Sequence, residues 1–304
     1  MGKNNILEAE LKLNDRSNGQ PLRVLTEEQF AFWLEYGYVV IKNAVNKEDL
    51  ERLTKLIWNF AEKDPNDPTT WYLSPSPEMK MKELNGTGMV ELYNHQLMWN
   101  NRTSEKIYNA FVDIWGTEKL WTSIDRVNLN LPKKDGQGSD GFIHWDVDTS
   151  KDPLPVNVQG VLSLVDASED MGGFQCVPEL FRDFPEWAKS QPKDRDPYHP
   201  DLTGYTPTKV VAEAGDLLIF NSMQPHGIRA NHSNKARLAQ YVSMFPAQED
   251  NTELRNTRVT SWHDKVSPVG DAFPGDPREW EKKHHERAIL TELGEKLLGL
   301  KSWE

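Results

Sequence analysis

The sequence predicts a mainly β protein with flanking helices, in which a helical N-terminal layer packs on a β core of the sandwich or barrel type. Three observations carry this prediction. Apolar residues follow helical spacing up to about residue 120. After it, short runs rich in β-forming residues alternate with turn residues. The chain shows neither βαβ alternation nor an internal repeat, which disfavours a parallel α/β fold.

The N-terminal layer begins with a helix whose start is marked clearly. Thr26 and Gln29 form a capping box, and Phe30 and Trp33 follow at helical spacing. Gly37 is suited to the end of this helix, and a short apolar strand is predicted over 38–41.

Two further helices complete the layer, which we place at residues 26–120. One begins after Asn46, and the other extends from about residue 104 to 115 and ends at Gly116. Between them, residues 64–77 contain four prolines and are predicted to be a loop.

The β core is predicted over 121–247 and consists of short strands separated by turn residues. The expected strands are 124–131, 142–147, 156–165, 174–177, 209–212, 217–221, 226–230 and 236–245. The segment at about 183–208 is rich in proline and aspartate and is interpreted as an insertion. Residues 248–304 form a polar C-terminal extension with a helical pattern near 278–298. The 304 residues suit one domain.

Composition limits the classes of partner. The formal net charge is −12, and a negative field repels phosphate backbones, so we expect no nucleic-acid partner. A single cysteine excludes an intrachain disulfide and a thiolate-rich metal site. No apolar run reaches the ~20 residues that span a bilayer, and no signal peptide is visible. We therefore expect a cytoplasmic protein with no membrane partner; no pattern indicates its oligomeric state.

The pattern His-x-acid occurs three times among the eight histidines. Mononuclear iron sites use two histidines and one carboxylate on one side of the metal. Residues i and i+2 of a strand point to the same side, so a His-x-Asp pair on a strand supplies two ligands. Only His144 and Asp146 lie in a predicted strand. The pair at His199 lies among prolines, and the pair at His284 lies in a helical pattern.

The third ligand is expected from a later strand. His226 follows an apolar strand and a short loop, while His232 is a rival in a turn-like cluster. Arg237 opens the next apolar strand, eleven residues after His226. An arginine in such a strand is costly to bury unless it meets an anion, ideally a carboxylate held by two hydrogen bonds. A structural salt bridge of Arg237 is the alternative.

The spacing of these residues resembles the phytanoyl-CoA dioxygenase-like (PhyH) family of iron(II)- and 2-oxoglutarate-dependent oxygenases. The resemblance rests on His144-x-Asp146, on residues 215–216 (GD) ten and eleven positions before His226, and on Arg237. Residues 172–178 (GGFQCVP) and 35–41 (EYGYVVI) resemble the family's glycine-rich turn and its N-terminal helix–strand segment. The similarity covers residues 26–247. It implies a double-stranded β-helix (jelly-roll, cupin-like) core with the metal at its open end.

The resemblance implies a chemistry and a set of site residues. His144, Asp146 and His226 would hold Fe(II), and Arg237 would bind the far carboxylate of the cosubstrate 2-oxoglutarate; O2 is the oxidant. These four residues are the predicted catalytic set. Some relatives have a hydroxyl residue two positions after the distal histidine, where this chain has Ile228. Other polar residues are therefore expected to help bind 2-oxoglutarate: Asn128, Asn130 and Gln159.

The predicted reaction is hydroxylation of an unactivated C–H bond of a small-molecule substrate, with release of succinate and CO2. Trp145, Tyr93 and His95 are the candidate substrate-lining residues. Two alternatives remain open: a non-redox jelly-roll protein that binds a metal or small molecule, and a zinc or manganese hydrolase on the same three ligands. The sequence does not indicate which small molecule is bound.

Overall fold

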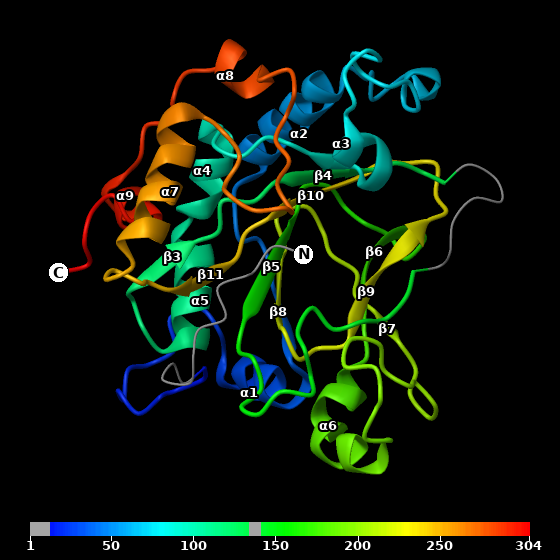
Figure 1. Cartoon of the computed structure of the whole chain (residues 1–304), viewed down its shortest axis with the longest axis vertical. Coiled ribbons are helices and arrows are strands. Elements are labelled where there is room, and N and C mark those ends of the chain that lie inside the picture. The colour runs from blue at the N-terminus through cyan, green and yellow to red at the C-terminus, as the bar shows by residue number, and fades with distance from the viewer. Residues whose placement is uncertain (1–12, 134–140) are drawn as a thin grey trace.

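The computed structural model describes residues 13–133 and 141–304, and consists mainly of antiparallel sheets covered by helices (Figure 1). In this part of the chain, a six-stranded sheet has the order β1-β8-β5-β10-β4-β2, a three-stranded sheet the order β7-β6-β9, and β11 pairs with β3. The strands are β1 (Tyr38–Ile41), β2 (Met89–Val90), β3 (Leu120–Thr122), β4 (Val127–Asn130), β5 (Val158–Ser163), β6 (Met171–Cys176), β7 (Thr208–Lys209), β8 (Leu217–Asn221), β9 (His226–Asn231), β10 (Arg237–Tyr241) and β11 (Met244–Pro246).

Most helices precede β3 or follow β11. The helices are α1 (Glu27–Tyr36), α2 (Lys47–Ala61), α3 (Lys82–Thr87), α4 (Gln96–Arg102), α5 (Glu105–Trp115), α6 (Pro178–Ser190), α7 (Thr252–Asp264), α8 (Trp280–His284) and α9 (Glu292–Leu298), with a 3-10 turn at Pro68–Thr70. Side chains of α2 and α5 join the core on one face of the large sheet. No helix of the described ranges has the length and apolarity needed to cross a membrane.

The helix boundaries predicted from local capping signals are confirmed. Thr26 and Gln29 form both hydrogen bonds of the capping box at α1. The Asn46 side chain accepts a hydrogen bond from the Asp49 N–H at the start of α2. Gly116 ends α5 in the left-handed conformation with φ 65°, which glycine adopts without steric cost.

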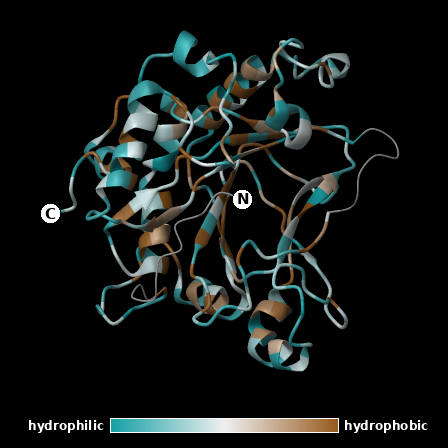
Figure 2. Ribbon diagram, viewed as in Figure 1, coloured by the Kyte–Doolittle hydropathy of each residue, from teal (hydrophilic) through white to brown (hydrophobic). Residues whose placement is uncertain are grey.

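The large sheet is buried on both faces because alternate residues of its strands enter different cores. Leu217 and Ile219 of β8 join the core that includes the α2 and α5 side chains. Leu218 and Phe220 point the other way and pack against Phe174 of β6. We call this second side the inner face, since it faces the three-stranded sheet. Hydrophobic residues follow the strands in Figure 2, whereas α8 at the surface is hydrophilic.

The prediction of a strand over 142–147 is wrong. Residues 141–150 are irregular, and a single antiparallel bridge joins His144 to His226. Trp145 explains the departure, because its side chain is fully buried among Phe184 and Trp187 of α6 rather than in either sheet. Its indole N–H donates to the Met223 carbonyl at 2.9 Å, which fixes the segment away from a regular ladder.

Several other expected boundaries differ from the structure. The strand predicted over 236–245 is divided into β10 and β11, which belong to different sheets. Helix α6 extends to Ser190, into the segment expected to be an insertion, and accommodates Pro185. The helix expected near 278–298 is instead α8 and α9, and the preceding helix α7 was not expected.

Candidate active site

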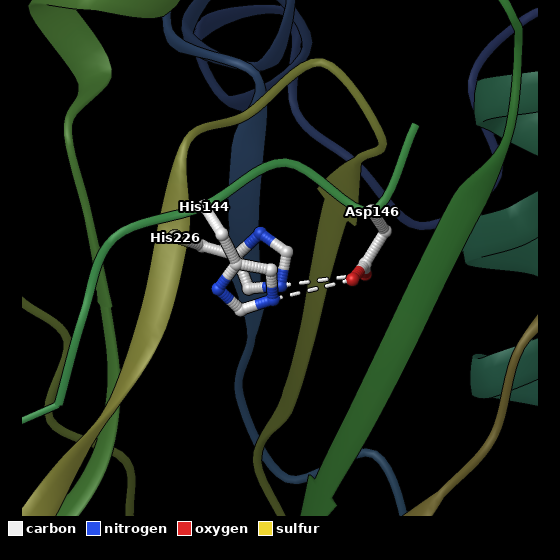
Figure 3. Close-up of side chains that lie close together, drawn as sticks. All are labelled: His144, Asp146 and His226. Carbon is white, nitrogen blue, oxygen red and sulfur yellow. Dashed lines mark ion pairs between the residues drawn. The ribbon is translucent and has the colours of Figure 1, made fainter. Parts of the chain in front are cut away.

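His144, Asp146 and His226 lie together between the two larger sheets (Figure 3). One ligand atom from each lies within 4.8 Å of the others. Nε2 of His144 is 3.3 Å from Asp146 Oδ1, and Nε2 of His226 is 3.4 Å from Asp146 Oδ2. The side chains of His144 and Asp146 are 21% and 28% exposed, so a small ligand can reach them, while that of His226 is 8% exposed.

The two histidines are positioned by the same backbone bridge. The His144 N–H donates to the His226 carbonyl at 2.8 Å, and the His226 N–H donates to the His144 carbonyl at 2.9 Å. Their ring centroids are 4.7 Å apart. The prediction that these residues come together therefore holds, although the expected i, i+2 strand geometry is replaced by one bridge and an irregular turn.

The surroundings of His226 fix its tautomer. Its Nδ1 lies 3.0 Å from the Gln224 carbonyl oxygen. A carbonyl only accepts, so Nδ1 carries the proton and the lone pair of Nε2 faces Asp146. Phe174 stacks on the ring at 5.4 Å, and Phe220 lies 4.6 Å away. Burial lowers the pKa of His226, which favours the neutral imidazole that a metal requires.

Asp146 is held by hydrogen-bond partners on two segments. Burial opposes its ionisation, but the hydrogen bonds with His144 and with the Gln159 amide outweigh burial and hold the pKa of Asp146 well below its usual range. The Gln159 Nε2 donates to Asp146 Oδ2 at 2.5 Å. The hydrogen bond with Asp146 also raises the pKa of His144 against the effect of burial. Asp146 is thus a carboxylate with both oxygens directed at hydrogen-bond donors.

Arg237 lies on the inner face of β10, opposite Asn130 of β4. It is 5% exposed, and burial lowers its pKa. Among the described residues, no carboxylate lies within ion-pair distance of its guanidinium, so the salt bridge considered as an alternative is not found there. Gly173 adjoins this guanidinium: a Cβ at that position would lie 3.0 Å from Arg237 Nε.

The three other residues predicted to bind 2-oxoglutarate occupy different environments. Gln159 binds the Asp146 carboxylate, as described above. The Asn128 amide donates to the Thr87 carbonyl at 3.1 Å, so part of its hydrogen-bonding capacity is used by the backbone. Asn130 is half-buried beside Arg237 and is the one of the three that pairs with it across strands.

The three candidate substrate-lining residues have structural contacts that sequence reasoning did not anticipate. Trp145 is fully buried in the cluster around α6. His95 caps α4, because its Nδ1 accepts the Leu97 N–H at 3.2 Å. Tyr93 is 2% exposed and packs 6.1 Å from Phe273 of the C-terminal extension. The structure brings none of the three into the His144–Asp146–His226 cluster.

Sequence reasoning missed Tyr241, which is half-buried on β10 and lies within electrostatic range of Arg237. Burial is also the main cause of the raised pKa of Tyr241. The sequence contained a signal for this residue, because Tyr241 follows Arg237 by four positions and residues four apart on a strand share a face. The role of the Gln224 carbonyl had no sequence signal, since any residue supplies a backbone oxygen.

The model of the phytanoyl-CoA dioxygenase (PhyH) family matches residues 33–239. A putative phytanoyl-CoA dioxygenase of Dictyostelium discoideum is 22% identical over 320 residues, covering 89% of this chain and 86% of that protein.

Two solved structures share the fold at lower identity. A hypothetical protein from Escherichia coli matches with a TM-score of 0.66 and 17% identity over 93% of this chain and 87% of that one. The epimerase SnoN, solved with Fe3+, α-ketoglutarate and nogalamycin RO, matches with a TM-score of 0.51 and 16% identity over 73% of this chain and 83% of its own.

Proposed function

Because this chain belongs to the phytanoyl-CoA dioxygenase family and is therefore an iron(II)- and 2-oxoglutarate-dependent oxygenase, we propose that His144, Asp146 and His226 hold its iron. The proposed reaction hydroxylates an unactivated C–H bond of a small molecule. Substrate, 2-oxoglutarate and O2 give the hydroxylated product, succinate and CO2, so one oxygen atom enters the product and the other enters succinate.

The three proposed ligands are of the types that bind iron in mononuclear sites. Two imidazole nitrogens and one carboxylate, all directed at a common point, suit a mononuclear iron site with positions left for other ligands. The proton on His226 Nδ1, held by the Gln224 carbonyl, keeps the Nε2 lone pair available. Bound there, iron(II) with 2-oxoglutarate supplies the activation of O2 that protein side chains alone do not provide.

The single observation that carries the cosubstrate assignment is the buried charge of Arg237. The guanidinium of Arg237 is 5% exposed and has no carboxylate partner among the described residues. Burying such a charge costs folding free energy unless an anion pairs with it. We propose that the far carboxylate of 2-oxoglutarate pairs with it, with Asn130 and Tyr241 as neighbours. The absence of a side chain at Gly173 leaves room for the Arg237 guanidinium.

Gln159 positions the proposed ligand Asp146. Its amide proton fixes the carboxylate plane from the neighbouring strand, a positioning role that is common around metal ligands. Asn128 is the weakest of the original cosubstrate candidates, because the Thr87 carbonyl occupies its amide.

We also infer that the two facing sheets are the halves of a double-stranded β-helix and that the chain is one oxygenase domain. The inner-face packing of Phe174 on Phe220 supports this inference, since side chains from both sheets fill one core. The helices before β3 and after β11 would then be additions to a common catalytic core.

The test is an anaerobic titration of the apoprotein with iron(II) and 2-oxoglutarate, which needs no knowledge of the substrate. We expect the weak visible charge-transfer band of iron(II) chelated by 2-oxoglutarate, and its loss in Asp146→Ala. Iron binding without the band would contradict the cosubstrate assignment. Failure to bind iron would contradict the ligand assignment and favour a non-redox binding protein.

A further inference from the structure

A cavity of about 210 Å³ lies between the β core and the C-terminal extension (residues 248–304), and Gln159 is part of its wall. The core contributes Asp125, Gln159 and Ser243 to its wall, and the extension contributes Leu254, Arg258 and Phe273. Gln159 connects this cavity with the candidate iron site, because its amide also donates to Asp146. A molecule in this cavity therefore lies one side chain away from a proposed iron ligand.

Arg258 brings a buried positive charge to this wall. It is 7% exposed, and burial, together with repulsion from Arg102, lowers its pKa to about 9. Its Nε donates to the Leu298 carbonyl at 3.0 Å, and its Nη2 donates to the carbonyls of Thr122 and Leu297 at 2.6 and 3.0 Å. In the described ranges, its Nη1 has no hydrogen-bond partner and no carboxylate pairs with the guanidinium.

Buried arginines of the described ranges fall into two groups, those paired with a carboxylate and those, like Arg102, Arg229 and Arg258, bonded only to backbone carbonyls. Arg278 pairs with Glu62 and Asp276 at 2.8 and 3.1 Å. Arg126 pairs with Glu83 at 3.5 Å. Arg258 instead resembles Arg237, whose buried charge also lacks a carboxylate within the part of the chain that the structure describes. Carbonyl oxygens satisfy hydrogen bonds of Arg258 but leave its charge uncompensated.

We propose that this cavity is the substrate site of the proposed oxygenase and that Arg258 binds a carboxylate of the substrate through Nη1. The proposal rests on the proposed function for its chemistry, while the binding of a carboxylate is a separate claim. The substrate class is a small monocarboxylic acid whose apolar part packs on Leu254 and Phe273. The carboxylate of Asp125 in the same wall disfavours a second acidic group.

The volume of the cavity limits the size of the group that the substrate can place there. A water molecule takes about 30 Å³ of liquid volume, so the cavity holds the equivalent of about seven waters, or an acid of roughly ten non-hydrogen atoms. An intact CoA thioester carries several phosphates, whereas the wall of this cavity provides one uncompensated cation. The extension lies beyond residues 33–239, so the family match does not include the part of the wall that selects the substrate.

The experiment measures binding of matched acids and amides to the protein loaded anaerobically with iron(II) and 2-oxoglutarate. The probes are 4-phenylbutyrate and octanoate, each compared with its neutral amide, by calorimetry and by perturbation of the charge-transfer band. We expect each acid to bind roughly tenfold or more tightly than its amide, as a charge-assisted hydrogen bond predicts. Arg258→Gln should remove this preference and leave 2-oxoglutarate affinity unchanged, and Arg255→Gln on the same helix serves as the matched control.

A second variant separates binding from folding, because Arg258→Gln also removes the contacts with the carbonyls of α9. Leu254→Trp fills the cavity and keeps Arg258, so we expect it to abolish binding of acids and amides alike with an unchanged thermal midpoint. Equal binding of acid and amide, no binding of any probe, or an acid preference that persists in Arg258→Gln would each overturn the proposal. Absence of the charge-transfer band before any probe is added would count against the proposed function, and calorimetry would still test the acid site.

Discussion

Gln159 Nε2 donates a 2.5 Å hydrogen bond to Asp146 Oδ2 from a strand that also forms the wall of the neighbouring cavity. The orientation of the carboxylate therefore depends on β5, whereas the two imidazoles depend on the bridge between His144 and His226. The three proposed ligands thus have two independent supports, and they respond to different substitutions.

Substitution of Gln159 should loosen the metal site without removing a ligand. We expect Gln159→Leu to weaken iron(II) binding by about 10- to 100-fold, because the Asp146 carboxylate loses the donor that orients it. An anaerobic iron(II) titration measures this effect, with Gln191→Leu at the exposed end of α6 as the control. An unchanged iron affinity would mean that His144 and His226 alone orient Asp146.

His226 and His232, the two candidates for the third metal ligand, can be compared directly by substitution. His226→Ala should abolish iron binding and turnover, since its Nε2 lies 3.4 Å from Asp146 Oδ2. His232→Ala should keep both, because its side chain is exposed and outside the cluster. Metal content after iron loading and desalting distinguishes the two variants. Loss of iron from His232→Ala instead would show that the third ligand is misassigned.

Substitution of Arg237 should weaken the binding of 2-oxoglutarate more than the binding of iron(II). We expect Arg237→Ala to weaken 2-oxoglutarate binding by about 100-fold, as loss of a charge-assisted pair predicts, with iron(II) affinity retained. Titration of the charge-transfer band with 2-oxoglutarate measures the change, and Arg237→Lys should give an intermediate value. If 2-oxoglutarate affinity were the same in all three proteins, the proposed cosubstrate site would be incorrect.

Glu91 should make stability depend on pH. It is 2% exposed, and burial, with repulsion from Asp276, raises its pKa from 4.5 to about 7. The folded state then binds more protons than the unfolded state between pH 4.5 and 7, so its contribution to stability falls as the pH rises through this window. Glu91→Gln should therefore increase the free energy of unfolding above pH 7 by up to about 3 kcal/mol and leave it unchanged below pH 4.5.

Urea denaturation at pH 4 and pH 8 checks this expectation, with the exposed Glu78→Gln as the control. A stabilisation that is equal at both pH values would exclude titration of Glu91 as its cause.

Local signals predicted the elements whose determinants are close in sequence. The capping box of Thr26 and Gln29 needs only four residues, and its helix begins where expected. The segment around His144 was misjudged because Trp145 packs on Phe184 and Trp187, about forty residues later. Alternation of apolar residues cannot reveal a partner that lies outside both sheets.

In the candidate site, too, some features could be predicted from the sequence and others could not. The spacing of His144, Asp146 and His226 is readable in the sequence, and the structure brings the three together. Gln159 was expected near the cosubstrate, and its contact with Asp146 was not foreseen, because spacing along a strand does not show which side chain of another segment it meets. Arg258 carried no sequence signal, since its hydrogen-bond partners are backbone carbonyls.

The bridge between His144 and His226 bears on how this enzyme can diversify. Both imidazoles are attached to one pair of hydrogen-bonded residues, so their spacing is independent of the length of the loops around them. Changes in the C-terminal extension can reshape the cavity without altering that spacing. Sequence variation in the extension can therefore alter substrate selection while the two histidines keep their positions.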